Sequence, residues 1–334
     1  MMRTRSSRWW LAAAIALAGL PGAWAPAWAQ SSTSSTQAWP TKPIRLIVPL
    51  TPGSATDVMS RVVMDQVSAQ IGQPVIVENR PGAGNTIGMA AVAKAEPDGY
   101  TVLANSSTHT VTPATRSNLG FEMTDLAPIV PLGNMPVVMV FNPSKGYKKL
   151  SDFVAAAKAK PGSVNYASAG AGNSSHLNGE RFRLAAGFEA VHLPFKGAPE
   201  AMTEVLAGRA DFYFAPLVNA LPLLKDGQLQ ALAVSGSARA STLPDVPTTV
   251  EAGYPNSEYN FWAGIFLPAK TPADVRARFY SEIAKALQTP AVREKLAGLG
   301  ADPMALTSAE FDALVKREIE TNTQLVKAAG IKVN

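Results

Sequence analysis

Two loops of small polar residues carry the side chains that could do chemistry in this sequence. The first, "TPGSATD" at residues 51–57, comes after the apolar run "IRLIV", and the second, "SAGAGNSSH" at residues 168–176, follows "VNYA". The first loop holds no obvious nucleophile, metal ligand or phosphate-binding lysine. Both loops lead into a helical pattern of apolar residues, so each is expected at the start of a helix.

The start of a helix is a natural place to bind an anion. It has up to four unpaired backbone N–H groups and the positive end of the helix dipole. Small side chains allow a ligand to approach these groups, and hydroxyls add donors without bulk. A carboxylate or a phosphate would suit such a site. If both loops face one cleft, a compact organic acid would be held from two sides; the alternative is that both are ordinary connections with ordinary helix caps.

The loops also carry signals of helix capping. Ser54 and Asp57 have the spacing of a capping box, and Asp57 is expected to cap its helix rather than to touch an anion. His176 lies in the first turn of the second helix, either near the ligand or as a packing residue, and Lys196 could bring an ammonium group near the cleft or remain in solvent. The predicted ligand-binding residues are Thr51, Gly53, Ser54, Ala55, Thr56, Asp57, Ser168, Ala169, Gly170, Asn173, Ser174, Ser175, His176 and Lys196.

The sequence gives weaker signals for hydrolase, metal-binding and dinucleotide-binding functions. Ser168 lies in "YASAG", which lacks the first glycine of a G-x-S-x-G nucleophile elbow. A secreted hydrolase would have to use Ser168 or Ser175 with His176 as the base. The three histidines are scattered and cysteine is absent, so no metal site and no cofactor are expected. The glycines of "RPGAGNTIG" miss the dinucleotide-binding spacing by one residue.

Strand-like and helix-like stretches alternate from residue 39 onward. Strands are expected at 44–48, 74–79 and 100–105, with helices at about 57–70 and 86–95. Two extended runs interrupted by Gly133-Asn134 break this rhythm, and the alternation then restarts. Alternation of this kind predicts mostly parallel sheets flanked by helices. We therefore expect two α/β lobes with a cleft between them: residues 40–133 plus 241–334, and residues 134–240.

Three helical segments are expected to close the chain, and each is preceded by a threonine. Thr271 and Thr307 are followed three residues later by Asp274 and Glu310, which is the capping-box pattern. Thr289 is followed directly by Pro290.

The N-terminus has the form of a secretory signal peptide. Arg3, Arg5 and Arg8 precede a short apolar run, and Ala27-Trp28-Ala29 fits a cleavage site, with Ala23-Trp24-Ala25 as an alternative. Residues 1–29 are thus expected to be removed on export to the periplasm, and residues 30–38 to form a flexible leader. The chain has a formal charge of +5, of which these arginines supply three. Without these three arginines, basic and acidic residues are nearly equal in number, and this near-neutral charge argues against nucleic-acid binding.

Several segments, taken together and in order, resemble one family along essentially all of residues 39–334. They include "IRLIVPLTPGSATDVMSRVV", "VIVENRPGAGNTIG", "PDGYTVL", "YASAGAGNSSHLNGE", "FKGAPEAMTEVLAGRADF" and "LPDVPTTVEAGYP". The chain resembles the extracytoplasmic solute receptors of tripartite tricarboxylate transporters, the Bug-type family. The resemblance implies a two-lobe type II periplasmic binding protein, monomeric and not an enzyme, that closes on a small organic acid and hands it to membrane permease subunits.

The resemblance also has departures that bear on the ligand. Ser54 replaces the second glycine of the family's first loop, Asn173 stands where serine is common, and Ala215 occupies a position where the family often has an acid. The missing acid at Ala215 argues against a ligand with an ammonium group. The family implies di- and tricarboxylates or aromatic carboxylates, and the departures leave open which of these acids is bound. A sensor subunit that binds the same acids and signals to a membrane kinase is the remaining alternative to transport.

Overall fold

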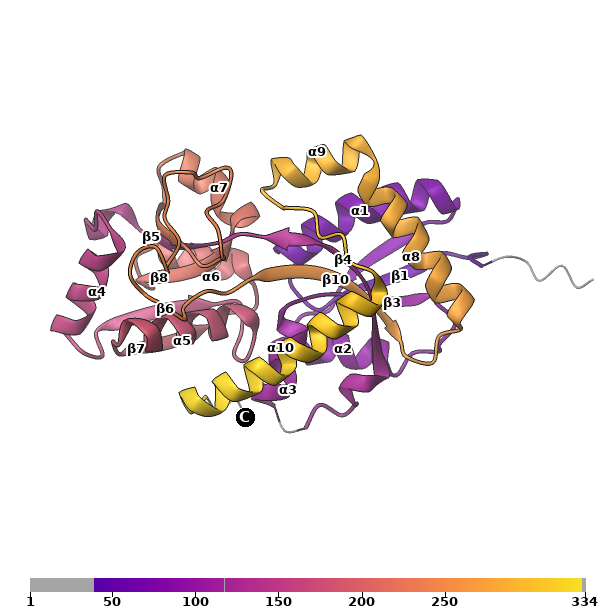
Figure 1. The fold of residues 1–334 in the computed structure, drawn as a ribbon, viewed down its shortest axis with the longest axis horizontal. Helices are drawn as coiled ribbons and strands as arrows, with labels where there is room; N and C mark the ends of the chain where they lie inside the picture. Colours follow the sequence, from indigo (N-terminus) through magenta and orange to yellow (C-terminus); the bar gives the residue numbers. More distant parts are fainter. Residues whose placement is uncertain (1–38, 117, 332–334) are drawn as a thin grey trace, which may run out of the picture. The chain divides into compact units, whose positions relative to one another are not determined.

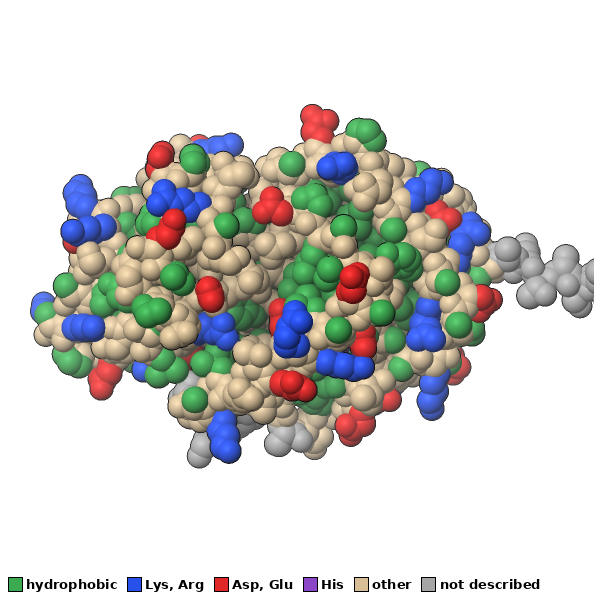
Figure 2. All heavy atoms as spheres, viewed as in Figure 1, with side chains coloured by type: hydrophobic (Ala, Val, Ile, Leu, Met, Phe, Trp, Pro, Cys, Tyr) green, Lys and Arg blue, Asp and Glu red, His purple; other side chains and the backbone are tan. Residues whose placement is uncertain are grey.

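The chain forms two five-stranded mixed sheets, sheet A and sheet B, in a computed structural model that describes residues 39–116 and 118–331 (Figure 1). The predicted signal peptide and leader lie outside the described residues. In the part of the chain that is described, no helix is long and apolar enough to cross a membrane. Lys and Arg side chains are interspersed with Asp and Glu over the face shown in Figure 2, in keeping with the nearly balanced charge.

Sheet A has the strand order β2-β1-β3-β10-β4. Strand β1 pairs in parallel with β2 and β3, whereas β10 is antiparallel to β3 and β4, so four of the five strands run in one direction. The strands are β1 (Ile44–Val48), β2 (Val75–Asn79), β3 (Thr101–Ser106), β4 (Leu126–Met135) and β10 (Phe261–Pro268).

Sheet B repeats this arrangement with the order β7-β6-β8-β5-β9. Strand β6 is parallel to β7 and β8, and β5 is antiparallel to β8 and β9. Both sheets are thus mostly parallel in strand direction, as predicted. The strands are β5 (Val137–Phe141), β6 (Val164–Ser168), β7 (Ala190–Pro194), β8 (Phe212–Pro216) and β9 (Gln230–Val234).

Helices flank the sheets. Around sheet A lie α1 (Ala55–Ile71), α2 (Thr86–Ala93), α3 (Thr108–Thr115), α8 (Ala273–Gln288), α9 (Pro290–Gly298) and α10 (Ser308–Ala329); around sheet B lie α4 (Leu150–Ala159), α5 (Ser174–Ala186), α6 (Ala198–Leu206) and α7 (Leu217–Lys225). Short 3-10 turns are η1 (Ala83–Asn85), η2 (Met123–Asp125) and η3 (Pro143–Lys145).

Sheet A is covered on both faces because its strands alternate apolar side chains between the two sides. Leu46 of β1 belongs to the core that includes Met59 and Val63 of α1. Its neighbour Ile47 belongs to a second core, with Met89 of α2 and Phe311 of α10. Burial on both faces explains why the strands read as continuous apolar runs in the sequence.

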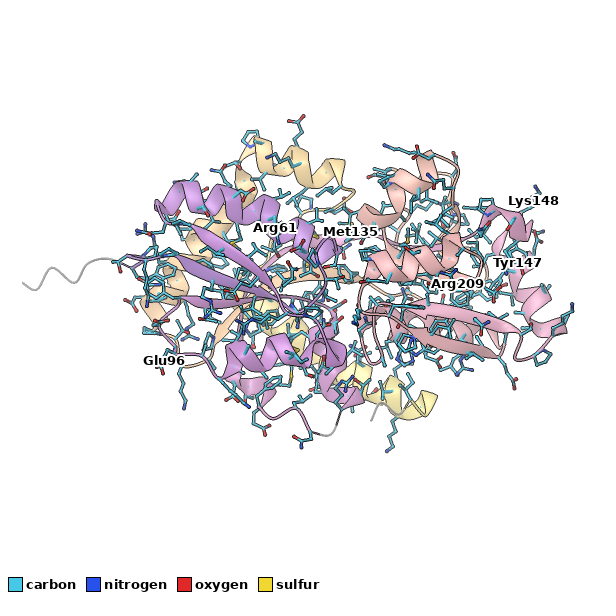
Figure 3. The ribbon with its side chains drawn as sticks, turned by 180° about the vertical axis from the view of Figure 1, so that it is seen from behind. Arg61, Glu96, Met135, Tyr147, Lys148 and Arg209 are labelled. Atoms are coloured by element: carbon cyan, nitrogen blue, oxygen red, sulfur yellow. The ribbon has the colours of Figure 1, made fainter. Side chains whose placement is uncertain are left out.

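A single residue separates strand β4 of sheet A from β5, the first strand of sheet B along the chain. Strand β4 ends at Met135, marked in Figure 3, and β5 begins at Val137, with Pro136 between them. The predicted break at Gly133-Asn134 is wrong, because β4 continues through these residues. Asn134 exchanges backbone hydrogen bonds with Asp302 at 2.9 and 2.8 Å. A Cβ at residue 133 would lie 2.9 Å from the Asp302 carbonyl oxygen, so the glycine permits this approach.

The capping predictions for the last helices have mixed outcomes. The capping box of Thr307 and Glu310 is confirmed at the start of α10. The box expected at Thr271 is wrong: α8 starts one residue later, with Pro272 as its N-cap, and Thr271 Oγ1 is buried without a partner among the described residues. Pro272 has the extended backbone that an N-cap requires, which moves the start of the helix beyond the threonine.

Candidate ligand-binding site

A cavity of about 30 Å³ is lined by the starts of α1 and α5 together with the ends of β3 and β8. A volume of this size holds about two water molecules. Seven of the predicted residues line this cavity: Ser54, Ala55, Thr56, Ala169, Asn173, Ser174 and Ser175.

The start of α1 presents polar groups that nothing in the described chain satisfies. Val58 N–H makes the first intrahelical bond, to Ser54 C=O at 2.9 Å, so the N–H groups of residues 55–57 precede it. The predicted Ser54–Asp57 capping box is wrong, since the Ser54 side chain caps no N–H group. Ser54 Oγ and Thr56 Oγ1 are buried and lack a partner among the described residues.

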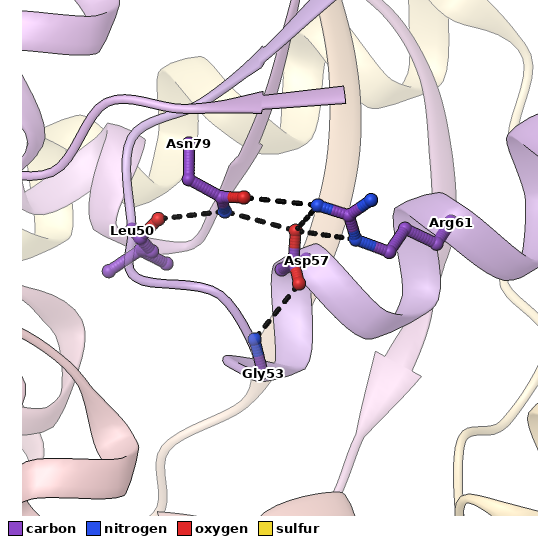
Figure 4. A network of polar contacts seen from close by, with 5 residues as sticks. All are labelled: Leu50, Gly53, Asp57, Arg61 and Asn79. Atoms are coloured by element: carbon purple, nitrogen blue, oxygen red, sulfur yellow. Dashed lines mark hydrogen bonds and ion pairs between the residues drawn. The ribbon is translucent and has the colours of Figure 1, made fainter. Parts of the chain in front are cut away.

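Asp57 holds the loop before α1 in place (Figure 4). Its Oδ2 accepts Gly53 N–H at 2.9 Å, and its Oδ1 accepts from Arg61 Nε and Asn79 Nδ2, both at 3.0 Å. Asn79 Nδ2 also donates to Leu50 C=O at 3.0 Å. Burial alone would raise the pKa of Asp57, but these hydrogen bonds outweigh it and hold the pKa below its ordinary value. Asp57 is therefore an ionised support for the loop, and it does not line the cavity.

The start of α5 is mostly satisfied by the protein itself. The N-cap residue is Asn173, and its Oδ1 accepts His176 N–H at 3.0 Å. Ser174 N–H donates to Thr108 Oγ1 at 3.1 Å. Ser175 Oγ accepts Ala169 N–H at 2.9 Å and donates to Asn173 Oδ1 at 2.9 Å. The two helix starts thus line one cavity but differ in how many of their donors are already used.

The other predicted residues do not line the cavity. Thr51 Oγ1 is buried against Gly197, where a side chain would collide with it. The Gly53 carbonyl accepts from Asn219 Nδ2 at 2.7 Å, a bond between the α1 loop and α7. Ser168 Oγ bonds the backbone of Gly170. Lys196 is exposed.

Two histidines stack beneath the α5 loop. The rings of His176 and His192 lie 3.8 Å apart, 4° from parallel. His176 Nδ1 accepts Gly172 N–H at 3.1 Å, and His192 Nε2 lies 2.6 Å from Ser168 Oγ. The partner of Ser168 is thus His192, not the His176 that a hydrolase was expected to use. Ser168 is fully buried, so a substrate has no access to its hydroxyl.

Sequence reasoning missed several residues that line the cavity. Thr108 follows β3 in "NSSTHT", another strand followed by small hydroxylated residues, and this pattern could have revealed it. The polar residues missed are Ser106, Thr108, Asn178, Tyr213 and Tyr259, and the apolar ones are Leu50, Val137, Ala198, Phe214, Pro216 and Phe261. Among the described residues, none that lines the cavity is charged, and no three His, Asp or Glu side chains cluster to hold a metal.

Comparison with known proteins identifies the family. A family model described as the tripartite tricarboxylate transporter family receptor matches residues 59–331. The chain belongs to this family. The protein BugT of Bordetella pertussis is 36% identical over 304 residues, which cover 90% of this chain and 93% of BugT. This receptor family consists of non-enzymatic solute-binding proteins, as predicted.

Solved structures of similar proteins match this chain along most of its length. The periplasmic binding protein BugD superposes with a TM-score of 0.84 at 29% identity, covering 88% of this chain and 99% of BugD. The Rpa4515 protein of R. palustris, solved with adipate, gives a TM-score of 0.84 at 28% identity, covering 88% of this chain and 99% of that protein. The predicted type II periplasmic binding protein fold is confirmed, with one five-stranded mixed sheet in each half.

Proposed function

We propose that this receptor binds a small organic acid by its carboxylate in a cleft between two lobes, residues 40–133 plus 241–334 and residues 134–240. The observation that carries the proposal is the start of α1. There, Ser54 Oγ and Thr56 Oγ1 are buried and have no partner in the described chain, next to N–H groups that precede the first intrahelical bond. Such donors favour an anion, and a hydrogen bond to a charged group contributes about 1.5–3 kcal/mol.

Transport is the role that fits this site best. The receptor would be exported to the periplasm by its N-terminal segment, close on the acid by hinge motion, and deliver it to the permease subunits of a tripartite tricarboxylate transporter. Support comes from the family and from the relative solved with adipate. Loss of growth on the acid after deletion of the gene, with growth restored by the intact gene, tests transport against a sensing role.

A thermal-shift screen tests the binding proposal directly. The purified receptor is heated with mono-, di- and tricarboxylates, including aromatic acids. An acid present at 100 times its Kd adds about 2.7 kcal/mol of stability, which raises the melting temperature measurably. The proposal fails if no carboxylate raises it.

A further inference from the structure

We infer that the preferred ligand is a monocarboxylate whose other end is uncharged and carries a hydroxyl group. This narrows the organic acids proposed above and rests on that proposal. It follows from the difference between the two helix starts, from one unpaired amide oxygen, and from the neutral lining of the cavity.

The helix starts provide one place for a carboxylate rather than two. At α1, the Ser54 and Thr56 hydroxyls have no partner among the described residues, and the N–H groups of residues 55–57 precede the first intrahelical bond. At α5, the Ser174 N–H is taken by Thr108 Oγ1, and the His176 N–H is taken by Asn173 Oδ1. An anion at α5 would have to break one of these bonds or bind through the Ser175 N–H between them, whereas α1 offers three consecutive N–H groups, those of residues 55–57, before its first intrahelical bond. A carboxylate is therefore bound at α1, and the rest of the ligand extends toward sheet B.

Asn178, on α5, offers the ligand an acceptor. It lines the cavity and is 1% exposed, and its Nδ2 donates to Ser235 Oγ at 3.0 Å. The Ser235 hydroxyl donates its only hydrogen to Tyr259 C=O at 3.1 Å, so its oxygen can only accept from Asn178. This bond fixes the orientation of the amide. Asn178 Oδ1 is left buried without a donor among the described residues.

An unpaired buried acceptor selects for a ligand that brings a donor. Leaving such an oxygen unsatisfied is costly, and a site of this kind rejects analogues that lack the donor. A second carboxylate would place a negative charge beside Asn178 Oδ1 with no cation to pair it. An ammonium group would lack a carboxylate partner, because no described residue that lines the cavity is charged. A neutral hydroxyl satisfies the oxygen without either penalty.

The experiment is isothermal titration of the purified receptor with matched acids of four, five and six carbons. Each length is tested with a methyl, hydroxyl, carboxylate or ammonium group at the far end; at six carbons these are hexanoate, 6-hydroxyhexanoate, adipate and 6-aminohexanoate. At the best length, the hydroxy acid is expected to bind about tenfold or more tightly than each of the other three. Equal or tighter binding of the diacid, the amino acid or the methyl acid would overturn the inference.

The two proposals fail in different ways. If none of these acids binds and the broader carboxylate screen is also negative, the receptor proposal itself is wrong. If acids bind but the hydroxy acid has no advantage, only the preference for a hydroxylated monocarboxylate is wrong.

Asn178→Leu tests the residue behind the preference. The variant removes the acceptor and keeps a side chain of similar volume. The hydroxy acid is expected to lose about tenfold in affinity, while the methyl acid of the same length binds unchanged or more tightly. Circular dichroism and thermal melting check that the variant folds. An unchanged ratio between the two acids in the folded variant would contradict the role of Asn178. The wild-type titrations decide the ligand class even if the variant does not fold.

Discussion

Thr108 Oγ1 donates a hydrogen bond to Ser174 Oγ at 3.0 Å and accepts one from Ser174 N–H at 3.1 Å. One side chain at the start of α3, beside sheet A, thus bonds the hydroxyl and the N–H group of the first residue of α5, beside sheet B. The two residues are 66 positions apart in the chain, and both line the cavity. This pair links two elements that line the cavity from the sides of sheet A and sheet B.

Removing this link is expected to destabilise the protein. Thr108→Val keeps the shape of the side chain but leaves the buried Ser174 N–H without an acceptor, which costs about 1–3 kcal/mol. Urea denaturation followed by circular dichroism measures the loss. Thr323→Val is the control, because this exposed threonine bonds only the Ile319 carbonyl of its own helix. A loss in Thr108→Val no larger than in the control would show that the link does not stabilise the fold.

Ser54→Ala is expected to separate binding from stability. The Ser54 hydroxyl has no partner in the described chain, so its removal leaves the free energy of unfolding unchanged or slightly higher. The same change is expected to weaken binding of the best acid by about 10- to 150-fold, the loss of one hydrogen bond to a charged group.

Ser60→Ala is a matched control on the same helix. Its hydroxyl is also buried and unpartnered among the described residues, but it does not line the cavity. Titration calorimetry is expected to give wild-type affinity for this variant. Equal losses of affinity in the Ser54 and Ser60 variants would show that the effect does not depend on the cavity.

Asp57 is expected to stabilise the protein less at acid pH, because protonation weakens its hydrogen bonds to the loop before α1. Its folded pKa lies below the ordinary value of about 4, so the ionised form favours the folded state. The stability that Asp57 contributes is complete above this ordinary value and is lost as the pH falls through the folded pKa. Asp57→Asn is expected to cost about 1–3 kcal/mol at pH 7. The difference in free energy of unfolding between the wild type and this variant should become smaller below about pH 4. Urea denaturation at pH 7, 5 and 3 checks this, and a gap that stays constant with pH would contradict it.

None of the three histidines is expected to titrate near neutral pH. Burial lowers the pKa of His109 to about 3 and of His176 to about 4. Burial, with the nearby His176, lowers the pKa of His192 to about 3. The unfolded chain takes up protons at these positions below about pH 6.5, so their contribution to stability falls as the pH drops from there. NMR of the ring C–H groups between pH 8 and 5 should show no titration, and a midpoint within that range would refute this.

The fold was largely predictable because its helices and strands have apolar patterns of the right period. The expected strand at 44–48 agrees with β1 to the residue, and the helix expected at about 57–70 forms as α1, Ala55–Ile71. Helix α3 was not predicted: its sequence "THTVTPAT" has low helix propensity and an internal proline. Tertiary packing stabilises the helix despite its low propensity, since Val111 is buried with Leu177, Tyr259 and Val326.

The site was predictable only in part, because its decisive features depend on distances across the fold. The small-residue loops indicated where an anion could bind. No spacing in the sequence shows that Thr108 reaches Ser174, that Ser54 Oγ caps nothing, or that the Ser235 hydroxyl orients the amide of Asn178.

All the strands of sheet B come from one uninterrupted stretch of chain, residues 137–234. This stretch carries Asn178 and Tyr213, whereas Ser54 and Thr56 come from outside it. The stretch is therefore a unit that recombination can exchange between related receptors. Under the binding mode proposed above, a graft of this kind replaces the wall expected to meet the far end of the ligand and keeps the start of α1 proposed to bind the carboxylate, so swapping this one segment is expected to change specificity.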